Sequence, residues 1–221
     1  TAARRLMVPE NLLGAVQEAI SKRLATTVVG DPRAEGVRMG SLAGLVQRNE
    51  VREKVNELAQ TQRIVFGNLD QFNVVGADAK AGAFVPPILF LNERPFEKTG
   101  CHHIEAFGPV STLMPYKTTE DAINLTRMGL GSLVCSIATA DDDIAREFVV
   151  GAATMHGRIL VLNSDCAKES TGHGSPMPLL THGGPGRAGG STRRLPAAQA
   201  FRARRRPRGV GRPVGQLRAR R

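Results

Sequence analysis

The chain has 221 residues and a formal net charge of +10, but eleven of its 30 Lys and Arg residues and none of its 20 Asp and Glu residues follow Gly190. Residues 1–190 therefore have a net charge of −1. The charge of this part gives no reason to expect a polyanion partner. No run of about 18 uncharged apolar residues and no signal-peptide pattern is present, which predicts a cytoplasmic protein that does not enter a membrane. Three cysteines without CxxC spacing predict no metal site.

The first predicted element is an amphipathic helix that begins near Pro9. Apolar residues recur at every fourth position, and a Pro-Glu pair suits a first helical turn. The helix ends before "VVGDPRAEG", where Gly-Asp-Pro indicates a turn. The apolar positions are Leu12, Val16, Ile20 and Leu24, with Leu13 beside them.

A second helix is predicted over about residues 45–60. Its buried face contains Val51, Val55 and Leu58, with apolar spacing typical of one side of a helix. Glu50 and Lys54 stand four residues apart, which predicts an ion pair on the exposed side.

Short apolar runs follow, and these are typical of strands. "RIVFG" and "AFVPPILFL" are bounded by Gly and Pro. Proline cannot donate a ladder hydrogen bond, so Pro86 and Pro87 predict that the second run forms an edge strand or contains a bulge.

Strands and helices then alternate. "VSTLMPY", "SLVCSIAT" and "GRILVLN" are strand-like, the last two as buried strands, and "TTEDAINLTRMG" and "ADDDIAREFVVGAA" are helical. Thr118 and Asp121 form a predicted capping box, and Gly129 closes the first of these helices. This βαβαβ order predicts one α/β fold with a parallel sheet and right-handed crossovers.

From Ser164 to Gly190 the pattern is replaced by a long loop rich in Gly, Ser, His and Pro. Because it leaves the carboxyl end of a predicted strand, we expect a functional loop. Its "GHGSP" and "HGGPGRAGG" segments lack the strand–loop–helix context of a phosphate loop. His173, Ser175 and His182 suggest nucleophilic catalysis but have no recognisable acid partner, and Cys101 beside His102 resembles an activated thiol only superficially.

The segment "EAFGPV" places Glu105 and Phe107 two residues apart. In an extended segment both side chains would point to one side. The carboxylate could accept hydrogen bonds from ribose hydroxyls while the phenyl ring packs on a flat cofactor ring. The alternative is a loop carboxylate beside a core phenylalanine.

The succession of "EAFGPV", "TTEDAINL", "ILVLN" and a Gly-rich loop resembles the C-terminal catalytic half of the NAD(P)-dependent aldehyde dehydrogenases. "AKESTGHGSP" and "THGGPGRAGG" resemble the aldehyde dehydrogenase half of the bifunctional phenylacetate-degradation proteins, which also carry an enoyl-CoA-hydratase-like domain. The resemblance spans Thr1 to about Gly190. It implies the parallel-sheet α/β catalytic domain of that family, in truncated form.

The resemblance also implies a reaction, the oxidation of a CoA-linked semialdehyde to the acid with NADP or NAD. It further implies a homo-oligomer that acts in aerobic phenylacetate degradation. Glu105 would hold the nicotinamide ribose, with Phe107 beside it. Asn163, His173 and Ser175 would belong to the aldehyde-binding loop. "TAARRLMVP" resembles the stretch directly after the nucleophilic cysteine, so we expect no catalytic residue in this fragment and no activity from it alone. An aldehyde dehydrogenase with another substrate is the alternative.

Residues 191–221 depart from the family pattern. They contain eleven arginines, and Arg, Ala, Pro and Gly dominate, which is expected of GC-rich coding sequence read in a shifted frame. We expect a disordered basic tail that forms a second unit after residues 1–190. A helix from Pro196 to Arg206 is the local alternative. A nucleic-acid-binding tail is the rival function, disfavoured because only Phe201 is aromatic.

Overall fold

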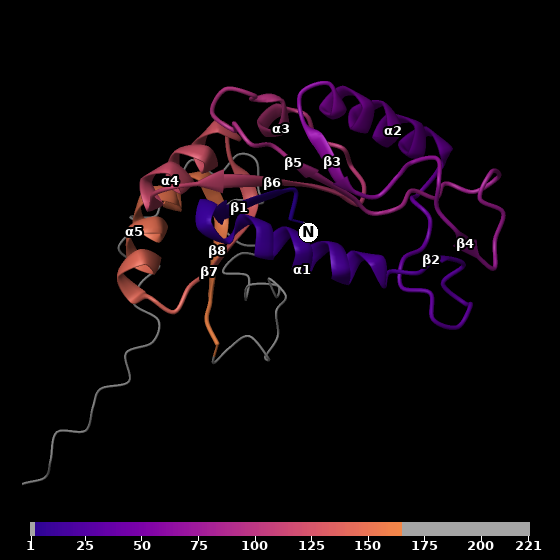
Figure 1. The fold of residues 1–221 in the computed structure, drawn as a ribbon, viewed down its shortest axis with the longest axis horizontal. Helices are drawn as coiled ribbons and strands as arrows, with labels where there is room; N and C mark the ends of the chain where they lie inside the picture. The colour runs from indigo at the N-terminus through magenta and orange to yellow at the C-terminus, as the bar shows by residue number, and fades with distance from the viewer. Residues whose placement is uncertain (1–2, 165–221) are drawn as a thin grey trace, which may run out of the picture.

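A computed structural model describes residues 3–164 of the chain (Figure 1). Strands and helices alternate along most of this range. In chain order they are β1 (Arg5–Pro9), η1 (Glu10–Leu12), α1 (Leu13–Ala25), β2 (Val29–Gly30), α2 (Leu45–Ala59), β3 (Arg63–Phe66), β4 (Val74–Val75), β5 (Ile88–Leu91), α3 (Gly100–His103), β6 (Val110–Tyr116), α4 (Thr119–Met128), β7 (Ser132–Ala138), α5 (Asp142–Ala152), η2 (Ala153–Met155) and β8 (His156–Leu162). The predicted α/β fold class is confirmed.

A four-stranded sheet with the order β1-β6-β5-β3 forms the centre of the molecule. β6 pairs in parallel with both β1 and β5, and β3 pairs antiparallel with β5. Helix α1 lies against one face, and α2 and α3 lie against the other (Figure 1). Side chains alternate along β5, so Ile88 and Phe90 pack with α2, and Leu89 and Leu91 pack with α1. Burial on both faces is typical of parallel strands.

The two proline residues do not limit β5 to an edge, so that prediction was wrong. β5 begins at Ile88, directly after Pro87, and lies between β6 and β3. Because the prolines precede the ladder, no strand hydrogen bond is lost. A bulge does occur, but in the partner strand β3, between Ile64 and Phe66.

The helices agree with the predicted apolar spacing, with differences at their ends. Helix α2 buries Val51, Val55 and Leu58 as predicted. Lys54, however, pairs with Glu57 at 2.9 Å and not with Glu50. Before α1, Leu12 ends a 3-10 turn and is about half exposed, so the apolar stripe, which is only partly buried, begins at Leu13. Strands β2 and β4, which form a short parallel ribbon, were not predicted.

The chain after β6 forms a second sheet, separate from the main one. β7 and β8 pair in parallel, as predicted, from Ser132↔His156 to Ala138↔Leu162. β6 was expected in the same sheet, and that expectation was wrong because β1 and β5 already occupy both of its edges. The chain turns into β7 through Leu130 and Gly131, both with positive φ.

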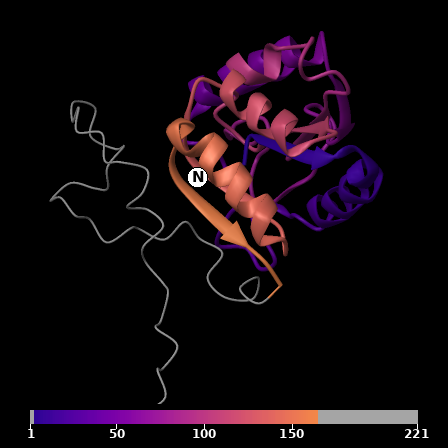
Figure 2. The ribbon, with the colours of Figure 1, turned by 90° about the vertical axis from the view of Figure 1, so that its left-hand side faces the viewer.

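Helices α4 and α5 cover one face of the β7–β8 pair (Figure 2). Helix α4 has the predicted capping box, in which Thr118 and Asp121 each bond the other's backbone N–H, and it ends at Gly129. The residues of strands β7 and β8 are all exposed or partly exposed. The prediction of two buried strands was therefore wrong, because helices cover one side of this pair within residues 3–164.

Candidate functional site

Glu105 and Phe107 lie in the segment that connects α3 to β6, at the amino end of that strand. Both side chains are exposed, Phe107 by 72%, whereas Ala106 between them is buried. This alternation is what an extended segment produces. Within residues 3–164, the Glu105 carboxylate has no ion pair or hydrogen-bond partner. A free carboxylate and an exposed phenyl ring therefore lie two residues apart in this segment.

The backbone beside Phe107 is held by helix α2. The Gln47 side chain donates a hydrogen bond of 2.6 Å to the Phe107 carbonyl and accepts one of 3.0 Å from the Ala43 N–H. Gly108 lies so close to this helix that a Cβ there would be 3.0 Å from two methyl carbons of Val51. The glycine of the motif is therefore explained by its packing against α2, whereas the exposed Phe107 side chain is not.

Among the other predicted site residues, only Asn163 lies within the described part of the chain, and it does not join this pair. Asn163 is exposed and follows β8, a strand in a different sheet from β6. His173 and Ser175 lie outside the described residues, as do His182 and the tail after Gly190. The roles of Glu105, Phe107, Asn163, His173 and Ser175 therefore remain predictions.

The described cysteines are poor nucleophiles. Burial raises the pKa of the Cys101 thiol and also that of Cys135, whereas reactive cysteines have lowered pKa values. Cys101 accepts a hydrogen bond of 3.2 Å from the Asn92 amide and lies 3.6 Å from the Met114 sulfur. Within residues 3–164, no group of His, Cys, Asp and Glu has a metal-binding arrangement.

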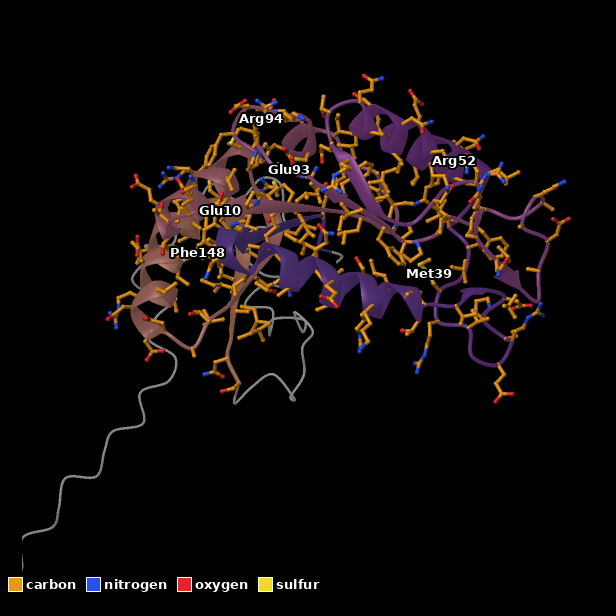
Figure 3. The ribbon with its side chains drawn as sticks, viewed as in Figure 1. Glu10, Met39, Arg52, Glu93, Arg94 and Phe148 are labelled. Carbon is orange, nitrogen blue, oxygen red and sulfur yellow. The ribbon has the colours of Figure 1, made fainter. Side chains whose placement is uncertain are left out.

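A cleft with a volume of about 360 Å³ lies at the opposite edge of the main sheet, beyond the carboxyl ends of β1, β5 and β6. Figure 3 shows Glu10, Glu93 and Arg94 gathered there. Four of its charged groups pair with one another, in the Arg94–Glu97 bridge of 3.0 Å and the Lys117–Glu10 bridge of 4.0 Å, and these side chains are largely exposed. Because neither Glu105 nor Phe107 lines this cleft, we do not assign the site to it.

Sequence reasoning missed the side chains that hold the Glu105 segment. These are Gln47 on α2, Arg4 and Arg5 at the start of β1, and His102 on α3. One signal was available: consecutive arginines at the start of an apolar strand need partners if that strand is internal or packed. The identity of those partners depends on contacts about 100 residues away in sequence, which no local pattern contains.

The fold is similar to that of solved aldehyde dehydrogenases. Aldehyde dehydrogenase C from Pseudomonas syringae, a C291A mutant solved with NAD+ and octanal, matches with a TM-score of 0.62 and 24% identity, over 73% of this chain and 32% of its own. A betaine aldehyde dehydrogenase mutant from Staphylococcus aureus, solved with NAD+, matches with a TM-score of 0.62 and 20% identity, over 71% of this chain and 31% of its own.

The sequence places the chain more narrowly. Residues 1–164 match the model of the aldehyde dehydrogenase family. The chain therefore belongs to the aldehyde dehydrogenase family.

Two curated relatives are more similar in sequence. The 3,4-dehydroadipyl-CoA semialdehyde dehydrogenase of Aromatoleum evansii is 40% identical over 221 residues, covering 97% of this chain and 43% of the relative. Protein MaoC of Klebsiella aerogenes is 49% identical over 154 residues, covering 69% of this chain and 44% of the relative. The chain thus spans less than half the length of these relatives. In residues 3–164, none of the helices is both long and apolar enough to cross a membrane.

Proposed function

We propose that this chain forms part of an aldehyde dehydrogenase that oxidises a CoA-linked semialdehyde to the carboxylic acid with NADP or NAD. The observation that carries the proposal is the exposed Glu105–Phe107 pair, which lies within the family's catalytic domain. A nicotinamide cofactor, when bound, would supply the hydride acceptor for this oxidation.

Glu105 has the chemistry needed to hold a ribose. Its carboxylate is exposed, lacks a partner within residues 3–164, and offers two acceptor oxygens to neighbouring hydroxyl groups. Phe107, two residues further on, offers an exposed apolar ring that can pack on a flat heterocycle. The pair fits a nicotinamide riboside on these grounds. NAD and NADP share this part, so the pair does not discriminate between them.

The name of one relative supports the proposed substrate class. The Aromatoleum evansii relative is named for a CoA-linked semialdehyde, which supports a CoA thioester substrate. A role in aerobic phenylacetate degradation is part of the same proposal. A homo-oligomeric enzyme in the cytoplasm, with a domain boundary near Gly190, belongs to the same proposal. The alternative is another aldehyde, as in the succinate semialdehyde dehydrogenase of Escherichia coli, which is 30% identical over 170 residues.

The nucleophile of the reaction is not among the described cysteines. Burial raises the pKa of the Cys101 and Cys135 thiols, which disfavours the thiolate form that a nucleophilic cysteine needs. We therefore expect this chain, assayed alone, to give no NAD(P)-dependent aldehyde oxidation. Turnover that disappears in Cys101→Ser would contradict that expectation.

The Glu105→Gln substitution tests the proposed role of the carboxylate. It keeps the size of the side chain but removes the charge and one acceptor oxygen, so charge-assisted hydrogen bonds to the ribose weaken. A displaced ring loses the geometry needed for hydride transfer. In an active enzyme that carries this chain, we expect the maximal rate to fall about tenfold or more, with a larger kinetic isotope effect for the deuterated aldehyde.

The matched control is Glu57→Gln, an exposed carboxylate on α2 that pairs with Lys54 and does not contact the Glu105 segment. This control should retain the parent rate, cofactor affinity and isotope effect. If Glu105→Gln also retains all three, the carboxylate has no part in hydride transfer and the proposed role is wrong.

A further inference from the structure

The segment that carries Glu105 is not part of a sheet, yet side chains from other elements hold it on both sides. Before it, Arg4 donates a hydrogen bond of 3.3 Å to the Ile104 carbonyl, and Arg5 contacts His102. After it, Gln47 donates to the Phe107 carbonyl. Glu105 therefore lies between two anchored points of the backbone.

Arg5 connects three elements. From the start of β1, one guanidinium nitrogen lies 3.1 Å from His102 Nδ1 on α3 and donates a hydrogen bond of 2.8 Å to the Leu125 carbonyl of α4. The other terminal nitrogen donates to the Thr126 carbonyl at 3.3 Å. These carbonyls belong to the last turn of α4, where cations are favoured. The guanidinium is consequently fixed in position before it reaches His102.

The protonation of His102 follows from its two partners. Arginine is only a donor, so His102 Nδ1 must accept. The Pro95 carbonyl, 2.9 Å from Nε2, is only an acceptor, so Nε2 carries the proton. His102 is 2% exposed, and both ring nitrogens are satisfied. A neutral imidazole of one tautomer thus bridges Arg5 and the loop before α3.

We propose that the Arg5–His102 contact positions Glu105 for cofactor binding. The contact fixes α3, whose last residue is two positions before Glu105, against β1 and α4. Gln47 fixes the other side of Glu105, so the backbone has little freedom to move the carboxylate. The inference rests on the proposed function of Glu105, but its structural part is testable without it.

A pair of substitutions at His102 separates hydrogen bonding from the filling of space. His102→Gln retains one hydrogen-bond acceptor and one donor. His102→Leu fills a similar space with an apolar side chain that has neither. Hydrogen exchange reports on the Ile104 N–H, which bonds the Gly100 carbonyl at 2.8 Å, and on the Gly108 N–H, which bonds the Ala106 carbonyl at 2.7 Å. The experiment uses the full 221-residue chain, with the Leu89 and Phe90 amides of β5 as the internal reference.

In His102→Leu, we expect these two amides to exchange at least tenfold faster than in the parent, while the β5 amides stay within twofold. In His102→Gln, exchange should return to within threefold of the parent. The contact does not position the segment if His102→Leu exchanges at the parent rate, or if the Gln variant is as fast as the Leu variant.

Arg5→Lys provides a second test in case His102→Leu does not fold. Lysine keeps the charge but lacks the planar fork that serves His102 and two carbonyls together, so the Ile104 amide should again exchange at least tenfold faster. The control is Arg127→Lys, because Arg127 also bonds a backbone carbonyl, that of Gly151 at 3.2 Å, without contacting α3. Equal exchange in the two lysine variants would overturn the inference.

Kinetics in an active enzyme that carries this chain connect the contact to the cofactor. Because the contact is proposed to act through Glu105, we expect His102→Leu to lower the maximal rate about tenfold and to raise the isotope effect, as Glu105→Gln does, and His102→Gln to restore both. If exchange accelerates but neither His102→Leu nor Glu105→Gln changes the rate or the isotope effect, the proposed function of Glu105 is wrong and the cofactor role falls with it. If Glu105→Gln alone has an effect, that function stands and the positioning role of Arg5 and His102 is wrong.

Discussion

At the scale of single residues, His102 shows how burial turns a titratable group into a structural one. Burial lowers its pKa below the ordinary value, and the nearby charges of Arg5, His103 and Arg4 lower it further, against an opposing hydrogen bond to Pro95. The folded state therefore favours the neutral ring that the Arg5 contact requires. Protonation would place an N–H of His102 against a guanidinium.

This pKa shift predicts how stability depends on pH. The unfolded chain takes up a proton on His102 near pH 6.5, whereas the folded chain resists it until lower pH. The stabilisation is fully present above about pH 6.5. As the pH falls below that value, the free energy of unfolding should fall by up to about 1.4 kcal/mol per pH unit from this residue.

Urea unfolding from about pH 5 to pH 8 measures this dependence. His102→Gln should reduce the slope below pH 6.5, but some slope should remain because burial also lowers the pKa of His156. His103→Gln, at an exposed position on the same helix, is the control for losing a histidine from α3. A His102→Gln slope equal to that of the parent would show that His102 does not titrate as inferred.

At the scale of elements, the amino end of α4 is stabilised by its capping box. Thr118 accepts from the Asp121 N–H at 3.1 Å, and Asp121 accepts from the Thr118 N–H at 3.0 Å. Thr118→Ala should therefore lower the free energy of unfolding by about 1 kcal/mol. Thr119→Ala, one residue inside the helix, is the control and should cost less than half as much in the same urea titration. Equal costs would contradict the cap.

The contact between α4 and α5 depends on a small residue. A Cβ at Gly151 would lie 2.5 Å from Cδ1 of Ile123 and 3.1 Å from its Cγ1 and Cγ2. Gly151→Ala should thus destabilise the fold by about 1–3 kcal/mol from overpacking, partly offset by about 1 kcal/mol of helix propensity.

Ile123→Val tests the cause, because valine lacks the closest carbon. In the double variant, the cost of Gly151→Ala should be smaller than in the parent background, which a double-mutant cycle from urea unfolding measures. Strict additivity of the two changes would show that the two side chains do not compete for the same space.

At the scale of the whole molecule, the two sheets differ in how completely they are covered. The main sheet has helices on both faces and a strand, β5, that is almost fully buried. In the β7–β8 pair, Leu133 is 56% exposed and Val161 is 41% exposed. A pair of strands with one covered face has fewer contacts to lose on opening.

Native-state hydrogen exchange should therefore separate the two sheets. We expect amides in β7 and β8 to exchange at least tenfold faster than those of Leu89, Phe90 and Leu113. Val51→Ala, in the main core, should accelerate the β5 amides more than the β7 amides. The same exchange rate throughout both sheets would mean that they open as one cooperative unit.

The sequence by itself determined most of the longer elements and the ends of α4, because these depend on neighbours along the chain. The box at Thr118 and Asp121, the Gly129 end of α4, the apolar face of α2 and the exposed "EAF" alternation all follow from local spacing. The same motifs led to the aldehyde dehydrogenase family, which the family match confirms.

Only the tertiary structure decided which strands share a sheet and what holds Glu105. Because β1 and β5 already pair with both edges of β6, β7 and β8 form a sheet of their own. β5 can lie inside the main sheet because Pro87 directly precedes its first residue, Ile88. The partners of Arg5 lie 97 to 121 residues away. Local patterns specify which backbone conformation is favoured and which side chains avoid water. The pairing of strands and the positioning of the Glu105 segment depend instead on groups that are distant in the sequence and compete for the same hydrogen-bond donor, strand edge or space.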